Sequence, residues 1–79
     1  MKTPRNLSAQ DLIKILGKYG YQVTRQKGSH IRLTSHSEKG AHHVTIPNHD
    51  PLRLGTLSSI LTDVADYLNI EKEEIINKL

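Results

Sequence analysis

The chain contains no cysteine. Disulfide bonds, thiolate metal sites and a cysteine nucleophile are therefore excluded, and nothing in the sequence supports secretion. No apolar run approaches the ~20 residues that span a bilayer. No apolar segment of the signal-peptide type follows residues 1–6. Internal repeats and low-complexity segments are also absent. We therefore expect a cytoplasmic protein that makes no membrane contact.

The length of 79 residues predicts a single domain over residues 1–79. A chain this short buries only about 60% of the surface that it exposes when unfolded, so its core must be thin. The sequence has room for one sheet and two or three helices.

Charge is unevenly distributed along the chain, although the net charge is only +3. Residues 1–40 contain eight Lys or Arg and two acidic residues, which gives +6, whereas residues 41–79 contain three basic and six acidic residues, which gives −3. A one-sided basic surface suits a polyanion such as nucleic acid. The alternative is a basic surface that serves only solubility.

The first predicted helix covers residues 9–18. Ser8 is a good N-cap, and Asp11 three residues later completes a capping-box pattern with the shorter acid. Apolar residues recur at helical spacing between these two ends. Gly20 is the expected helix stop, because glycine readily adopts the left-handed conformation of a C-cap.

A second amphipathic helix is predicted with Thr56 as its N-cap. Its apolar stripe runs from Leu57 to Leu68 at 3.6-residue spacing, and Asn69 ends it. The last ten residues predict a short acidic helix.

Three segments between these helices predict strands, because apolar and polar residues alternate in them with a period of two. Residues 27–29 form the first turn, the polar run 36–40 forms a loop, and Pro47 ends the last strand. The predicted strands cover residues 21–26, 30–35 and 42–46.

Pairing the strands as antiparallel hairpins separates their residues onto two faces, because directly opposite residues share a face. We pair Gln26 with His30, which puts Thr24 opposite Arg32, and we pair Thr34 with His43, which puts Arg32 opposite Thr45. The polar face then carries Gln22, Thr24, Gln26, His30, Arg32, Thr34, His43 and Thr45, and the apolar face carries Val23, Ile31, Leu33, Val44 and Ile46.

The order α-β-β-β-α with a short extra helix predicts an α+β fold. Both long helices have one apolar stripe and the sheet has one apolar face, so we expect both helices on one face of a three-stranded antiparallel sheet. The polar face is then left open to solvent.

The candidate active site lies on this open face. Histidine takes up and releases a proton near neutral pH, so His30 can serve as general base towards a ribose 2′-hydroxyl, or as general acid. Arg32 is the candidate clamp for two phosphate oxygens, and Lys27 is expected to position the RNA backbone. The tight turn at Gly28 and Ser29 allows close approach of that backbone. The alternative for His30 is an exposed imidazole without a function.

The other histidines have weaker assignments. His43 shares the polar face and is a possible auxiliary acid or base, whereas His42 points to the opposite side of the same strand. His36 falls in the predicted loop, and His49 follows in the link after Pro47. Diverging neighbours and the lack of an H-x-x-x-H pair disfavour a metal site, so we expect no metal and no cofactor.

The start of the second helix is a further phosphate candidate. Free backbone N–H groups around Thr56, with Arg53 beside them, suit an anion. Ordinary capping by Thr56 is the alternative.

Four segments, in order and at matching spacing, resemble the HicA family of mRNA-interferase toxins over nearly the whole chain. A short helix precedes Gly20 and Tyr21, and the other segments fit the patterns R-x-K-G-S-H, H-V-T-[VI]-P-x-H and L-x-x-G-T-L-x-x-I-L. They correspond here to residues 25–30, 43–49 and the region from Leu54 to Leu61.

The resemblance implies a fold like the double-stranded RNA-binding domain. It also implies a metal-independent endoribonuclease of a type II toxin-antitoxin system that cleaves mRNA with one essential histidine, here His30. Arg25 enters the RNA-binding set through the first pattern, and His49 gains support from the second. The implied partner is a cognate HicB-type antitoxin that covers the active site. A non-catalytic RNA-binding module and a pure interaction protein are the alternative functions.

Overall fold

The computed structural model of the chain describes residues 6–38 and 40–79. It has the predicted α+β architecture, with a helix, three antiparallel strands and two further helices. The elements are α1 (Ala9–Gly17), β1 (Gln22–Lys27), β2 (His30–Ser37), β3 (Gly40–Pro47), α2 (Leu54–Leu68) and α3 (Lys72–Ile76).

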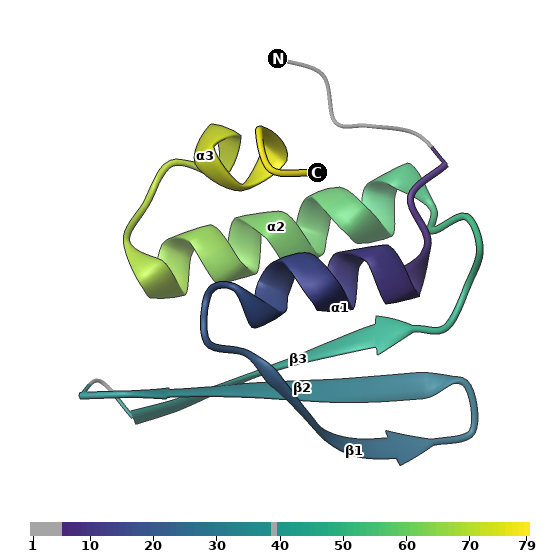
Figure 1. Cartoon of the computed structure of the whole chain (residues 1–79), viewed down its shortest axis with the longest axis horizontal. Coiled ribbons are helices and arrows are strands. Elements are labelled where there is room, and N and C mark those ends of the chain that lie inside the picture. The colour runs from purple at the N-terminus through teal and green to yellow at the C-terminus, as the bar shows by residue number, and fades with distance from the viewer. Residues whose placement is uncertain (1–5, 39) are drawn as a thin grey trace.

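The helices lie on one face of the sheet, as expected. Helices α1 and α2 run side by side over it, and α3 lies over α2 on the side away from the strands (Figure 1). The sheet has the order β1-β2-β3, so β2 is central. The core is formed by apolar side chains of the helices, β2 and β3; the fully buried ones include Leu12, Leu16, Ile31, Leu33, Ile46, Leu57, Leu61, Val64 and Ile75.

Helix α1 begins and ends as predicted. The Ser8 hydroxyl accepts a hydrogen bond from the Asp11 N–H at 3.1 Å, and the Asp11 carboxylate accepts one from the Ser8 N–H at 3.3 Å. Gly20 has φ +92°, and Tyr21 donates its N–H to the Leu16 carbonyl at 3.1 Å. This bond closes the helix with glycine in the left-handed region.

The prediction that Thr56 caps α2 is wrong. Arg53 is the N-cap residue and makes no side-chain capping bond, so Thr56 falls inside the first turn. The physical reason lies in Leu52, which is buried and brings the chain onto the core directly before the helix. The other end of α2 agrees with the prediction, because Asn69 ends it at φ +57°.

The predicted register between β2 and β3 is confirmed, with Thr34 opposite His43 and Arg32 opposite Thr45. Both strands extend further than predicted. His36 belongs to β2, opposite Ala41, and not to a loop. Lys39 of the predicted loop lies outside the described residues.

The register between β1 and β2 needs a correction, because β1 contains a β-bulge between Val23 and Arg25. The predicted pairing holds as far as Val23, which lies opposite Leu33. Beyond the bulge the partners shift by one residue, since two residues of β1 oppose one residue of β2. The predicted pairs Thr24–Arg32 and Gln26–His30 are replaced by Arg25–Arg32, Gln26–Ile31 and Lys27–His30.

The sequence predicts that Val23 lies on the apolar face that the helices cover, and the prediction that it is covered is wrong. Val23 shares a face with Leu33, but its side chain is 49% exposed. All of β1 is exposed, because the helical layer covers β2 and β3 and leaves this edge strand largely bare. Gln26, opposite Ile31, has left the polar face.

Candidate nucleic-acid interface

The face of the sheet that points away from the helices carries the predicted site. We call it the polar sheet face, and define it by three rows of residues that lie opposite one another on β1, β2 and β3. The rows are Lys27–His30–Pro47, Arg25–Arg32–Thr45 and Gln22–Thr34–His43, with Thr24 added by the bulge.

His30 stands in the first row, directly after a two-residue turn. Gly28 has φ +58°, and a Cβ atom there would meet nothing within 4 Å, so this position needs glycine for its backbone angle and not for space. The Ser29 carbonyl accepts a hydrogen bond from the Asn48 N–H at 2.6 Å. The turn is therefore held from both sides, by β1 and by the end of β3. The His30 side chain is exposed.

The second row places two arginines at directly opposite positions of β1 and β2. Arg25 lies directly opposite Arg32, and like charges in that position are destabilising. The residues of β1, β2 and β3 include no Asp or Glu. Within residues 6–38 and 40–79, the only ion pair joins His42 and Asp63. The positive charge of this row is thus left without a protein counterion in the described region.

Hydroxyl groups and an imidazole form the third row. The Thr24 and Thr34 hydroxyl oxygens lie 2.8 Å apart, and the Thr34 hydroxyl lies 2.8 Å from Nδ1 of His43. Thr34 is only 4% exposed, whereas His43 is exposed. The three strands are joined through these side chains.

Other predicted site residues lie outside the rows. His49 and the turn that carries His30 lie at the same end of the sheet, and the His49 carbonyl accepts a hydrogen bond from the Ala9 N–H at 3.1 Å. Arg53 and Thr56 belong to the start of α2, at this same end of the molecule but in the helical layer (Figure 1). They are therefore not part of the polar sheet face.

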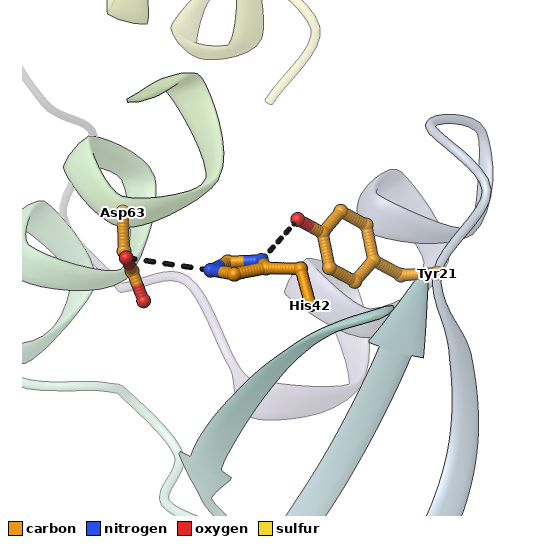
Figure 2. Close-up of polar contacts among 3 residues, drawn as sticks. All are labelled: Tyr21, His42 and Asp63. Carbon is orange, nitrogen blue, oxygen red and sulfur yellow. Dashed lines mark hydrogen bonds and ion pairs between the residues drawn. The ribbon is translucent and has the colours of Figure 1, made fainter. Parts of the chain in front are cut away.

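A second polar cluster lies on the helix side of the sheet, around His42. The Tyr21 hydroxyl lies 2.7 Å from Nδ1 of His42, and Nε2 of His42 lies 3.4 Å from an Asp63 carboxylate oxygen. Figure 2 shows the imidazole between these two groups, which come from the start of β1 and from α2. His42 also stacks on Tyr67, with ring centroids 4.5 Å apart.

This cluster connects α2 with both hairpins and is built for stability. The Tyr67 hydroxyl donates a hydrogen bond to the Gly40 carbonyl at 2.8 Å, beside the β2–β3 turn. Burial, followed by the charges of Tyr67 and Asp63, raises the pKa of Tyr21 to about 12. A tyrosine with a raised pKa keeps its proton and is a poor nucleophile at neutral pH, so we assign no chemistry to it.

Sequence reasoning missed two features of these sites. The bulge in β1 leaves no mark in the alternation of residues, so Arg25 was not expected opposite Arg32. The cluster around His42 joins residues far apart in sequence; the one available signal was that His42 faces the helices.

Two further properties of the described residues concern metal binding and membrane insertion. In the part of the chain that the structure describes, no three His, Cys, Asp or Glu side chains group as metal ligands would. None of the described helices combines the length and the apolar character that crossing a membrane requires.

Comparison with known families gives one match. The model of a family described as HicA toxin of bacterial toxin-antitoxin systems matches residues 9–65, well over half of the chain. These residues include α1, all three strands and most of α2. The comparisons with curated proteins and with solved structures gave no match.

Proposed function

The chain belongs to the family of HicA toxins of bacterial toxin-antitoxin systems, and from this premise we propose that it is an endoribonuclease that cleaves mRNA on the polar sheet face. His30 is the proposed general acid or base. The alternative, an RNA-binding module without chemistry, shares the face but needs no imidazole there.

One observation carries this proposal, namely the pairing of Arg25 with Arg32 on an open surface. Two arginines at directly opposite strand positions cost stability, and the described residues supply no carboxylate in an ion pair with either to offset it. Lys27 adds a third cation opposite His30 in the next row. A polyanion that lies across the strands would offset this repulsion.

The proposed chemistry uses the nucleophile that RNA already contains. The 2′-hydroxyl attacks the adjacent phosphorus and forms the 2′-O–P bond, while His30 takes the hydroxyl proton. The P–O5′ bond breaks, and the departing 5′-oxygen takes a proton from water, which reaches this exposed site. Arg32 stabilises the charge that develops on the phosphorane oxygens, because a guanidinium can bind two of them together. The products are a 2′,3′-cyclic phosphate and a 5′-hydroxyl.

Other residues are proposed to bind the RNA backbone. Arg25 and Lys27 contact phosphates, and the turn at Gly28 and Ser29 lets the backbone come close to His30. The three strands contain no Tyr, Phe or Trp, so the only rings that the polar sheet face offers for base stacking are imidazoles. Backbone contacts therefore dominate the proposed interface.

The residues beyond the polar sheet face have lesser proposed roles. Arg53 and Thr56 extend phosphate binding to the start of α2, where backbone N–H groups are free. His49 is an auxiliary group near the His30 turn. The proposed site of action is the cytoplasm.

Family membership implies a cognate antitoxin as partner. We propose that this partner is of the HicB type and that it covers the polar sheet face. An acidic surface on the partner would neutralise the same cations that bind RNA.

The test compares His30→Ala with His36→Ala in RNA cleavage assays that contain EDTA. His36 is a matched control, because it is also an exposed histidine of β2 on the same face. We expect the wild type and His36→Ala to cleave RNA, and His30→Ala to be slower by roughly 10²- to 10⁴-fold, the usual contribution of general acid–base catalysis. Unchanged circular dichroism would show that the variant is folded.

Two outcomes would reject the proposal. Cleavage by His30→Ala at the wild-type rate would remove the histidine mechanism. Binding of RNA without any cleavage by the wild type would favour the non-catalytic module.

A further inference from the structure

The side chains of Thr24, Thr34 and His43 are joined in series by hydrogen bonds, and we call this series the hydroxyl chain. It suggests a role for the third row in binding beyond the phosphate that is cleaved. It connects Thr24, Thr34 and His43 across all three strands, and its middle member is buried. A buried polar group needs hydrogen-bond partners, and here Thr34 has one on each side. Such a satisfied network holds its members in one arrangement.

The hydroxyl chain holds the imidazole of His43 in place. Its Nδ1 atom is held by the Thr34 hydroxyl, so the ring cannot turn freely, and Nε2 is left as the nitrogen available to a ligand. The contrast is His36, which lies on the same face but has no hydrogen-bond partner among the described residues. Only one of these two exposed imidazoles is built into the sheet.

The direction of the hydroxyl chain decides what Nε2 can bind. The Thr24 hydroxyl also lies 3.5 Å from the Arg32 carbonyl, which can only accept a hydrogen bond. If Thr24 donates there, Thr34 donates to Thr24 and Nδ1–H of His43 donates to Thr34. Nε2 of the neutral ring is then an acceptor that faces solvent.

The position of His43 excludes contact with a phosphate held by His30. One row of the sheet lies ~7 Å from the next, and His43 is two rows from His30. It is one row from Arg32, about the length of one nucleotide in an extended strand. A nucleotide that contacts His43 would therefore be the neighbour of the one bound by Arg32.

We propose that His43 accepts a hydrogen bond from the ribose 2′-hydroxyl of that neighbouring nucleotide. A 2′-hydroxyl is a donor that DNA lacks, so this contact makes binding selective for RNA beyond the position that reacts. This inference rests on the proposed function, because it assumes RNA on the polar sheet face. Thr34 is then a positioning residue that acts through His43.

The test measures binding, so that it does not depend on cleavage. The full chain carrying His30→Ala binds a short single-stranded RNA in which one deoxynucleotide is moved position by position. At one position next to the cleavage site, we expect the deoxynucleotide to weaken binding by roughly 3- to 10-fold, the size of a neutral hydrogen bond. When His43→Ala is added, the deoxynucleotide at that position should no longer weaken binding.

Three further variants in the same background complete the design. Thr34→Ser keeps the hydroxyl and should bind like its parent, whereas Thr34→Val keeps the shape and should weaken binding in the manner of His43→Ala. His36→Ala should leave affinity unchanged. Circular dichroism and thermal unfolding check that each variant is folded.

The proposal fails if His43→Ala binds all-RNA as tightly as its parent. It also fails if the deoxynucleotide effect persists in that variant. If the wild type does not cleave RNA but the deoxynucleotide effect still depends on His43, the proposed nuclease is rejected and the inference about His43 stands. Absence of any RNA binding would reject both.

Discussion

Arg25 and Arg32 form a pair whose position costs stability and suits the proposed binding of an anion. They lie directly opposite on β1 and β2, and the described residues place no acidic side chain against them. Both positions are on an exposed or half-exposed surface, so the sheet does not need charge there for folding. The pair suits a surface that binds an anion.

Arg25→Gln should therefore stabilise the fold while it weakens RNA binding. Removing one of two opposed charges should raise the free energy of unfolding by roughly 0.2 to 1 kcal/mol, and less at high salt. Urea unfolding and RNA-binding titrations measure the two effects. Lys14→Gln is the control, because it removes the same charge from an exposed position of α1. Lower stability together with unchanged affinity would contradict this account.

At the scale of elements, the cluster around His42 ties α2 to the sheet at the end remote from His30. Tyr21, His42 and Asp63 come from the start of β1, from β3 and from α2, and Tyr67 stacks on the imidazole (Figure 2). A cluster of this kind contributes to stability and leaves the polar sheet face free.

The raised pKa of Tyr21 gives this cluster a measurable signature. Its pKa rises from an ordinary value of 10.0 to about 12 in the folded protein. Between these values the folded chain keeps the proton and the unfolded chain loses it, so the free energy of unfolding should fall as pH rises through this range. Tyr21→Phe should be less stable at neutral pH by about 1 kcal/mol, the usual net value of a hydrogen bond.

Urea unfolding of both proteins between pH 9 and 12 checks this prediction. The stability of the wild type relative to Tyr21→Phe should fall as the pH rises through this range, because only the wild type carries the shifted group. Parallel curves would show that Tyr21 does not titrate in this way. RNA cleavage at neutral pH should be the same for both proteins.

The elements also show where sequence reasoning succeeds and where it fails. Helix α1, the end of α2 and the β2–β3 register follow from capping residues and strict alternation, which are local signals. The bulge in β1 was missed because it leaves no mark in the alternation of residues. The Thr56 cap was wrong because the chain enters α2 from a buried Leu52, and such tertiary anchoring has no local signature.

Some features of the candidate site could also be predicted from the sequence, and others could not. Alternation predicted that His30, Arg32, Thr34 and His43 share a face, and the observed register agrees. The hydroxyl chain to His43 was not predicted, because it depends on Thr24 reaching Thr34 through the bulge. The cluster around His42 depends on α2 packing over β3, which sequence alone does not specify.

The acidic residues of the molecule are unevenly distributed. The strands carry Arg25, Lys27 and Arg32 and no carboxylates, whereas five of the eight acidic residues lie in α2, in α3 and at their junction, on the helix side of the sheet (Figure 1). These five are Asp63, Asp66, Glu71, Glu73 and Glu74. The helical layer also contains lysines, so the difference between the two sides is that the strands hold no acid.

Salt should weaken RNA binding in proportion to the cations that contact phosphate. With Arg25, Lys27 and Arg32 in contact, the logarithm of affinity should fall against the logarithm of salt concentration with a slope of roughly −2. Titrations of the His30→Ala protein at several salt concentrations measure the slope. The variant in which all three cations are replaced by Gln should lose this part of the slope and keep only what Arg53 contributes, and a flat wild-type response would contradict the proposed interface.

The bulge in β1 has an evolutionary consequence. Thr24 is the extra residue of the bulge, so two successive side chains face the same way, which a regular strand does not permit. Loss of this one codon would restore a regular strand and leave Arg25 and Lys27 opposite their present neighbours, while Thr34, whose hydroxyl contacts His43, would lose its hydroxyl partner on β1. Within the proposed interface, a single deletion would therefore change the hydrogen bonding behind His43 and leave the cations in place.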